Sequence, residues 1–128
     1  MESNTHLYKT VPITPIKVGN CELNSLRVEI DYDKGGLTFS GDTIPRGIIC
    51  RVKPIGIHDG IVSEIALGKQ HHVGFRVFLE DCGRRSPKKM KMYAEKILPH
   101  AEEIAGMYMN GKLNDAYLLI SKVANNEV

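Results

Sequence analysis

A basic run between residues 83 and 91 is the densest group of chemically active side chains in this sequence. Its cations are Arg84, Arg85, Lys88, Lys89 and Lys91. Ser86 suits the N-cap of a helix and Pro87 suits its first position, so the lysines fall at the start of a predicted helix. The exposed N–H groups of a helix start, together with these cations, would form a phosphate-binding site.

The same run has a simpler interpretation as the solvated start of a helix. Cations are disfavoured at that position because the N-terminal end of the helix dipole is positive. Their presence has to be offset, either by nearby carboxylates such as Glu80 and Asp81 or by an anion from outside. The sequence leaves both interpretations open.

A second group of cations is expected on the polar face of a predicted sheet. The side chains that would gather there are Arg27, Arg51, Lys53, Arg76 and Phe78, with Phe39 nearby. This combination resembles the platforms on which the bases of a single strand stack beside phosphate-binding cations. Glu29 and Asp31 dilute the positive charge, so an ordinary solvated face is the alternative.

Catalytic and metal-binding patterns are missing from the sequence. The histidines lack the HxH or HxxxH spacing of metal ligands, and His71 and His72, adjacent on a predicted strand, point to opposite faces. No serine lies in a GxSxG motif. We therefore expect a protein without cofactor, metal or catalytic residues, although a pocket lined by His58 or His71 would favour an enzyme.

The elements that position these residues change period in mid-chain. Up to about residue 80 the apolar residues alternate as in strands, and from Ser86 they recur every three or four residues as in helices. The predicted strands are residues 26–32, 48–53, 61–67 and 73–80, after an extended arm or edge strand in residues 1–20. Pro54 is expected to end the second strand.

Residues 36–43 have the glycine spacing of a phosphate-binding loop, but Asp42 stands where such a loop needs a lysine. A hairpin loop is the better interpretation. In the helical part, a first helix should kink or break near Leu98, because Pro99 removes a backbone hydrogen bond. Asn110 and Gly111 suit a C-cap, and a second helix follows them.

Length and composition indicate one domain over residues 1–128, with 42% apolar and 25% charged residues and a net charge of +2. No apolar stretch approaches the ~20 residues that cross a bilayer, and the first residues do not resemble a signal peptide. The three cysteines are expected to be free, with Cys50 buried. We predict a cytoplasmic α+β protein, in which an antiparallel meander of about four strands (residues 21–82) is followed by two helices (residues 86–124) packed on one face.

Two resemblances bear on function. A pattern similar to one in small uncharacterised proteins of bacterial mobile elements is formed by Lys34-Gly35-Gly36, Phe39, Gly41, Pro45-Arg46-Gly47 and Val52-Lys53-Pro54. It lies within residues 34–54 and implies a bacterial accessory protein, without implying an activity. Strands followed by a helix are also the arrangement of the Pur-type and Whirly-type single-strand binders, which is a resemblance of topology alone.

These observations lead us to expect a small non-enzymatic binding protein. Single-stranded nucleic acid is the first-choice partner, held by the cations of the basic run with help from the polar sheet face. The alternative is a protein–protein or accessory module that forms a homodimer and binds no nucleic acid. A sheet edge, the N-terminal arm or residues 107–109 would make that contact, and no membrane partner is expected.

Overall fold

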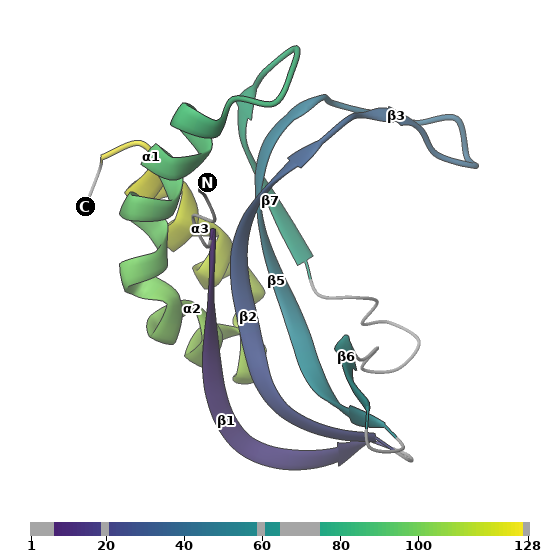
Figure 1. The fold of residues 1–128 in the computed structure, drawn as a ribbon, viewed down its shortest axis with the longest axis vertical. Helices are drawn as coiled ribbons and strands as arrows, with labels where there is room; N and C mark the ends of the chain where they lie inside the picture. The colour runs from purple at the N-terminus through teal and green to yellow at the C-terminus, as the bar shows by residue number, and fades with distance from the viewer. Residues whose placement is uncertain (1–6, 19–20, 59–60, 65–74, 127–128) are drawn as a thin grey trace.

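A computed structural model describes residues 7–18, 21–58, 61–64 and 75–126 of the chain (Figure 1). Strands come first and helices follow, so the protein is α+β as predicted. The strands are β1 (Tyr8–Val18), β2 (Cys21–Asp33), β3 (Gly36–Leu37), β4 (Thr43–Ile44), β5 (Gly47–His58), β6 (Ile61–Glu64) and β7 (Phe75–Asp81). The helices are α1 (Pro87–Ile97), the short 3₁₀ helix η1 (Leu98–His100), α2 (Ala101–Met109) and α3 (Leu113–Ala124).

The main sheet is antiparallel and has the order β1–β2–β5, with β6 and β7 sharing the far side of β5. β7 pairs with residues 47–52 of β5, and β6 pairs with residues 55–58. The last strand of the chain therefore returns to β5 instead of extending the sheet beyond β6. At the opposite side lies β1, so the segment predicted as an arm or edge strand is an edge strand.

β5 runs straight through Pro54, so the prediction that this proline ends the strand is wrong. Proline lacks the N–H that a strand donates to its neighbour, and it is tolerated where that neighbour is missing. Among the described residues, the pairing of β7 with β5 reaches Val52 and that of β6 begins at Ile55, and Pro54 lies between the two. Of the other predicted strand ends, residues 65–67 and 73–74 lie outside the described residues.

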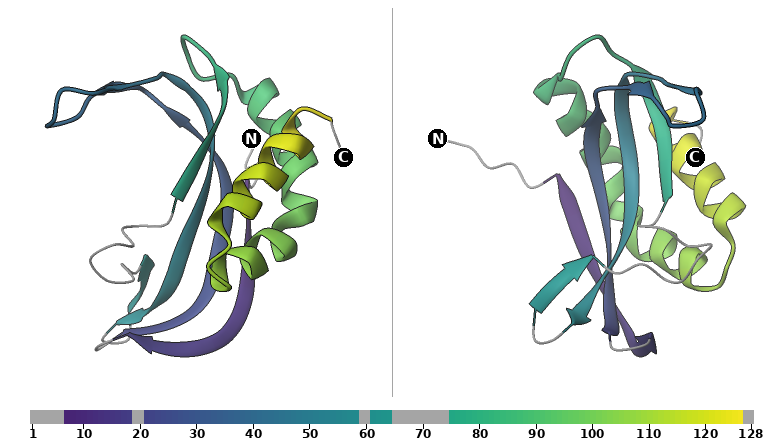
Figure 2. Two further views of the ribbon diagram at one scale, coloured as in Figure 1. Left: turned by 180° about the vertical axis from the view of Figure 1, so that it is seen from behind. Right: turned by 90° about the vertical axis from the view of Figure 1, so that its right-hand side faces the viewer.

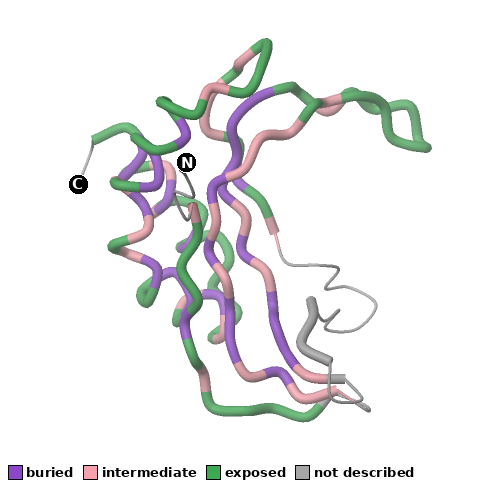
Figure 3. The backbone as a smooth tube through the Cα atoms, in the orientation of Figure 1, coloured by how far each residue is buried: buried purple, intermediate pink, exposed green. Residues whose placement is uncertain are grey.

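The sheet is curved, and the helices cover its convex face (Figures 1 and 2). This face is apolar because of the alternation in β2, where Leu26, Val28 and Ile30 are buried in the core. Each helix contributes a fully buried isoleucine: Ile97, Ile104 and Ile120. Figure 3 shows purple, buried residues alternating with less buried ones along the strands. The concave face is left to the alternate, more polar residues.

The start of the first helix follows the local sequence. Ser86 caps α1, because its side-chain oxygen accepts a hydrogen bond from the N–H of Lys89 at 3.4 Å, and Pro87 takes the first position. Pro99 lies in η1, a 3₁₀ turn that joins α1 to α2 without a gap, so the irregularity predicted near Leu98 is present as a change of helix type within one joined helix.

The end of α2 also matches its prediction. Gly111 has a φ of 73°, in the left-handed region that favours glycine. The N–H of Lys112 then donates to the carbonyl of Met107 at 2.8 Å, which satisfies one of the last carbonyls of the helix. α3 follows after this turn and packs against α2 and α1.

Candidate functional site

Lys89, in the predicted basic run, is bound to a carboxylate of the protein itself. Its Nζ lies 2.5 Å from Oε2 of Glu80 in β7, and the hydroxyl of Tyr93 donates to Oε1 of Glu80 at 2.8 Å. The hydrogen bond from Lys89, and then that from Tyr93, lowers the pKa of Glu80. Burial, and then the contact with Glu80, raises the pKa of Tyr93 to about 12. An internal carboxylate therefore offsets Lys89 at the helix start.

The side chain of Arg85 also contacts other residues of the protein. Its guanidinium carbon lies 5.9 Å from the centre of the Tyr32 ring, and its NH2 lies 4.0 Å from Oδ1 of Asp31. Arg51 approaches the same carboxylate from β5, at 3.3 Å from Oδ2. Arg85 is thus held loosely over the end of the sheet, with its side chain still mostly exposed.

Arg84, Lys88 and Lys91 differ from these two residues. All three are exposed. Within the part of the chain that the structure describes, no carboxylate oxygen lies within 4.0 Å of their charged groups. The structure therefore separates the predicted run into two cations bound internally and three that are open to a ligand.

On the concave face, the predicted cations are matched by carboxylates of the neighbouring strand. Lys53 lies opposite Arg27 in the register of β2 and β5, but its Nζ reaches Oε1 of Glu29 at 2.8 Å. Arg51 lies opposite Glu29 and reaches Asp31, two residues further along β2. Each cation thus pairs diagonally with a carboxylate, which avoids like charges in contact across the strands.

The other two cations of this face also have partners within the protein. Arg76 of β7 pairs with Asp33, and Arg27 stacks its guanidinium 4.5 Å from the centre of the Tyr8 ring. Phe78 is partly exposed and lines a small cavity of about 120 Å³ with Ile49. A phosphate at Arg51, Lys53 or Arg76 would have to displace a carboxylate from its cation. The stacking platform stays a prediction, and its charge is largely neutralised inside the protein.

The β3–β4 hairpin projects away from the sheet (Figures 1 and 2), and the sequence did not suggest its shape. Its loop is held by two backbone hydrogen bonds, from the N–H of Thr38 to Asp42 O at 2.9 Å and from the N–H of Gly41 to Thr38 O at 3.0 Å. The ring of Phe39 is fully exposed at the tip, with a relative exposure of 114%, and Leu37 is 75% exposed. Phe39 was predicted to lie near the polar sheet face. It lies instead at the tip of the projecting hairpin, away from that face.

The base of this hairpin adjoins the basic run. Asp33, Gly47 and Asp81 are register partners across β2, β5 and β7. The residues just beyond them are Lys34, Arg46 and Cys82, and the N–H of Cys82 donates to the carbonyl of Arg46 at 3.1 Å. The loop that leads into α1 is thereby joined to the base of the hairpin.

Lys34 and Arg46 are exposed and, among the described residues, make no ion pair. Together with the three open cations of the run they gather at one end of the sheet. We call this set the basic end: Lys34, Arg46, Arg84, Lys88 and Lys91. Lys34 and Arg46 were missed because they stand alone in the sequence. The two turn signals that flank residues 36–44 are the feature that could have indicated them.

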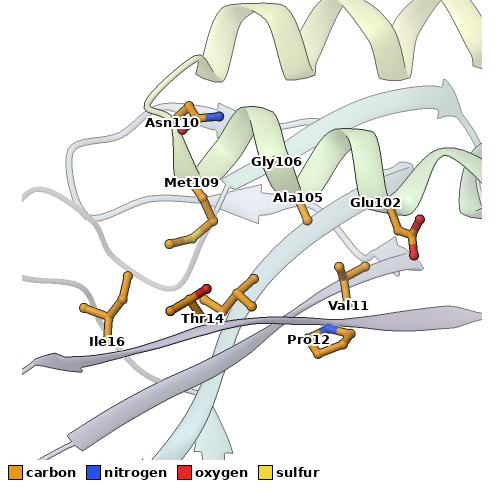
Figure 4. Close-up of a pocket in the computed structure, with 10 residues that line it drawn as sticks. Val11, Pro12, Thr14, Ile16, Glu102, Ala105, Gly106, Met109 and Asn110 are labelled. Carbon is orange, nitrogen blue, oxygen red and sulfur yellow. The ribbon is translucent and has the colours of Figure 1, made fainter.

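A groove lies between β1 and α2 (Figure 4). It has a volume of about 440 Å³, and its walls are mainly apolar, with Val11 and Ile16 on one side and Ala105 and Met109 on the other. The N-terminal arm and residues 107–109 were both predicted as possible protein contacts. The structure places β1 and Met109 on opposite walls of the same groove.

The cysteines and the described histidine His100 form no metal or catalytic cluster with other described residues. All three cysteines are free, Cys50 is buried as predicted, and burial raises the pKa of its thiol to about 12. His71, His72 and the side chain of His58 lie outside the described residues. Among the residues that are described, no three histidine, cysteine or acidic side chains gather to hold a metal ion. None of the described helices has the length and apolar character needed to cross a bilayer.

Comparison of the chain with protein-family models, with curated proteins and with solved structures gave no match in any of the three. The resemblance to proteins of bacterial mobile elements therefore stays a prediction. Function has to be argued from the geometry of this molecule.

Proposed function

We propose that this protein binds single-stranded nucleic acid at the basic end. The observation that carries the proposal is that five exposed cations, none with an ion-pair partner among the described residues, gather where β2, β5 and β7 meet the start of α1. Phosphates are the ligands that such cations bind. The start of α1 adds little to them, because Pro87 has no N–H and the N–H groups of Lys89 and Met90 donate to Ser86.

The internal ion pairs define which of the predicted residues take part. Arg84, Lys88 and Lys91 bind phosphates without giving up another partner. By contrast, four other cations would first have to leave a carboxylate: Lys89 would leave Glu80, Lys53 would leave Glu29, Arg51 would leave Asp31 and Arg76 would leave Asp33. The single strand therefore follows the end of the sheet, and the concave face contributes little to the affinity.

Titration of a fluorescent 20-nucleotide single strand tests this proposal. The double variant Arg84→Gln with Lys88→Gln should weaken binding about tenfold or more at 50 mM salt, and lower the slope of log K against log salt by ~0.7 for each lost contact. The matched control is Lys17→Gln with Lys112→Gln, which removes the same charge from exposed residues elsewhere. The proposal fails if the wild type does not bind at 50 mM salt, or if the two double variants bind equally.

A second candidate function is self-association, with a second copy of the chain in the groove between β1 and α2. The groove favours it because its walls are apolar and it lies beside the edge strand of the sheet, where backbone groups are open to another strand. Light scattering at about 100 μM protein distinguishes a monomer from a dimer, and a strictly monomeric mass excludes this candidate.

A further inference from the structure

The tip of the β3–β4 hairpin carries an apolar side chain, Phe39, that none of the described residues covers. Residues 36–43 are all exposed, and Phe39 at the turn is the most exposed of the large apolar side chains that the structure describes. This ring stands at the end of a projecting arm (Figures 1 and 2).

Hydrogen bonds hold the tip in one shape. Thr38 and Ser40 place their hydroxyl oxygens 2.9 Å apart, and Ser40 donates to Oδ2 of Asp42 at 3.0 Å. The N–H of Asp42 donates to the hydroxyl oxygen of Thr38 at 3.1 Å, and Gly41 takes a φ of 90° that closes the three-residue loop. The turn that carries Phe39 is therefore ordered by short polar side chains, which lowers the entropic cost of binding through the ring.

The surroundings of the hairpin favour nucleic acid over an apolar protein pocket as the partner of this ring. Lys34 and Arg46 stand at the two sides of the hairpin base, and the loop with Arg84 is hydrogen-bonded to that base through Cys82. A protein pocket that accepts an aromatic ring needs no cations beside it. An unpaired base, by contrast, comes with phosphates on both sides, and an aromatic ring beside cations is the combination that binds single strands.

We propose that Phe39 is a stacking residue, which packs its ring against an unpaired base while the basic end holds the neighbouring phosphates. This inference rests on the proposed function, and it adds the recognition of bases to the recognition of phosphates. It also assigns a role to the hairpin as a projecting finger that reaches between bases of a single strand but has no unstacked base to meet in a duplex.

The test uses two strands with equal numbers of phosphates: a 12-nucleotide single strand with all its bases, and one whose central four sites are abasic. Phe39→Leu removes the aromatic face and keeps an apolar side chain at an exposed position, so folding is unaffected, as circular dichroism will check. Phe39→Trp keeps the aromatic face. We expect Phe39→Leu to bind the complete strand about 5- to 150-fold more weakly and the abasic strand as the wild type does, whereas Phe39→Trp binds both at least as well.

The salt dependence separates this inference from the proposal on which it rests. Loss of stacking should leave the slope of log K against log salt unchanged, because the phosphate contacts remain. The stacking role is overturned if wild type and Phe39→Leu bind the complete strand equally. If Arg84→Gln with Lys88→Gln still binds that strand more weakly, the phosphate site stands, and the hairpin is then assigned to a protein partner. Absence of binding by the wild type overturns both.

Discussion

Nζ of Lys89 lies 2.5 Å from Oε2 of Glu80, whereas the adjacent Lys88 has no carboxylate within reach among the described residues. This difference predicts unequal roles for two neighbouring lysines. Lys88→Ala should weaken binding of a single-stranded oligonucleotide at least several-fold at 50 mM salt, because a phosphate contact is lost. Lys89→Ala should change the affinity much less, because its charge is already engaged.

Fluorescence anisotropy with both variants measures the difference, and each serves as the control for the other. If Lys89→Ala weakens binding more than Lys88→Ala does, the division between internally bound and open cations is wrong. The affinity of each variant should be compared at constant ionic strength, because binding to phosphates depends strongly on salt.

The pKa of Glu80 is lowered by its hydrogen bonds from Lys89 and Tyr93, which predicts an acid-sensitive contribution to stability. Above the ordinary carboxyl pKa of 4.5 this contribution is complete, because Glu80 is ionised both folded and unfolded. Below that value the unfolded chain takes up the proton first, so stability falls until the pH passes the folded pKa. Urea unfolding should therefore show a larger difference between wild type and Glu80→Gln at pH 7 than at pH 3, and a difference independent of pH would contradict the contact.

Two glycines should respond in opposite ways to replacement by alanine. A Cβ at Gly106, inside α2, meets nothing within 4 Å, so Gly106→Ala should raise the free energy of unfolding by about 0.5–1 kcal/mol through helix propensity. A Cβ at Gly47 would lie 2.1 Å from the carbonyl oxygen of Glu80, so Gly47→Ala should lower it by about 1–3 kcal/mol. Chemical denaturation of both variants checks the prediction, and destabilisation by Gly106→Ala would mean that the helix is packed differently there.

Cys50 should be unreactive in the folded protein. It is fully buried in the sheet, and its thiol has a pKa of about 12, so almost no thiolate forms at neutral pH. Mass spectrometry after brief alkylation with iodoacetamide at pH 8 should find Cys50 unmodified, and modified once urea unfolds the chain. Rapid modification of Cys50 in the native state would place it outside the core.

The architecture could be predicted because burial on one face imposes a period on the sequence. Val28 and Ile30 alternate with polar residues in β2, while Ile97 and Ile104 recur at helical spacing. Alternation defines the face of a strand but not its neighbour, which is why the pairing of β7 with β5 was not foreseen. The continuation of β5 through Pro54 was not foreseen either, because the partners of a strand on each side of a proline are defined only in the folded sheet.

The sequence allowed us to predict which cations belong to the candidate site, but not which of them form ion pairs within the protein. Lys88 and Lys89 look alike in the sequence, and only the position of Glu80 on a strand nine residues before Lys89 separates them. Phe39 was expected near the polar face of the sheet. Two turns instead direct the hairpin outward, and the direction of a projecting arm is not encoded in the period of its apolar residues.

The residues at the tip of the finger bury nothing in the core, so their identity is almost independent of the stability of the fold. The sequence of the tip can therefore change independently of the sheet and helices that form the core. Evolution can alter the three-residue loop from Phe39 to Gly41 without repacking the interior, and a loop of the same length can be grafted there. A change of target would then require replacement of one short loop, while the curved sheet and its helices stay as they are.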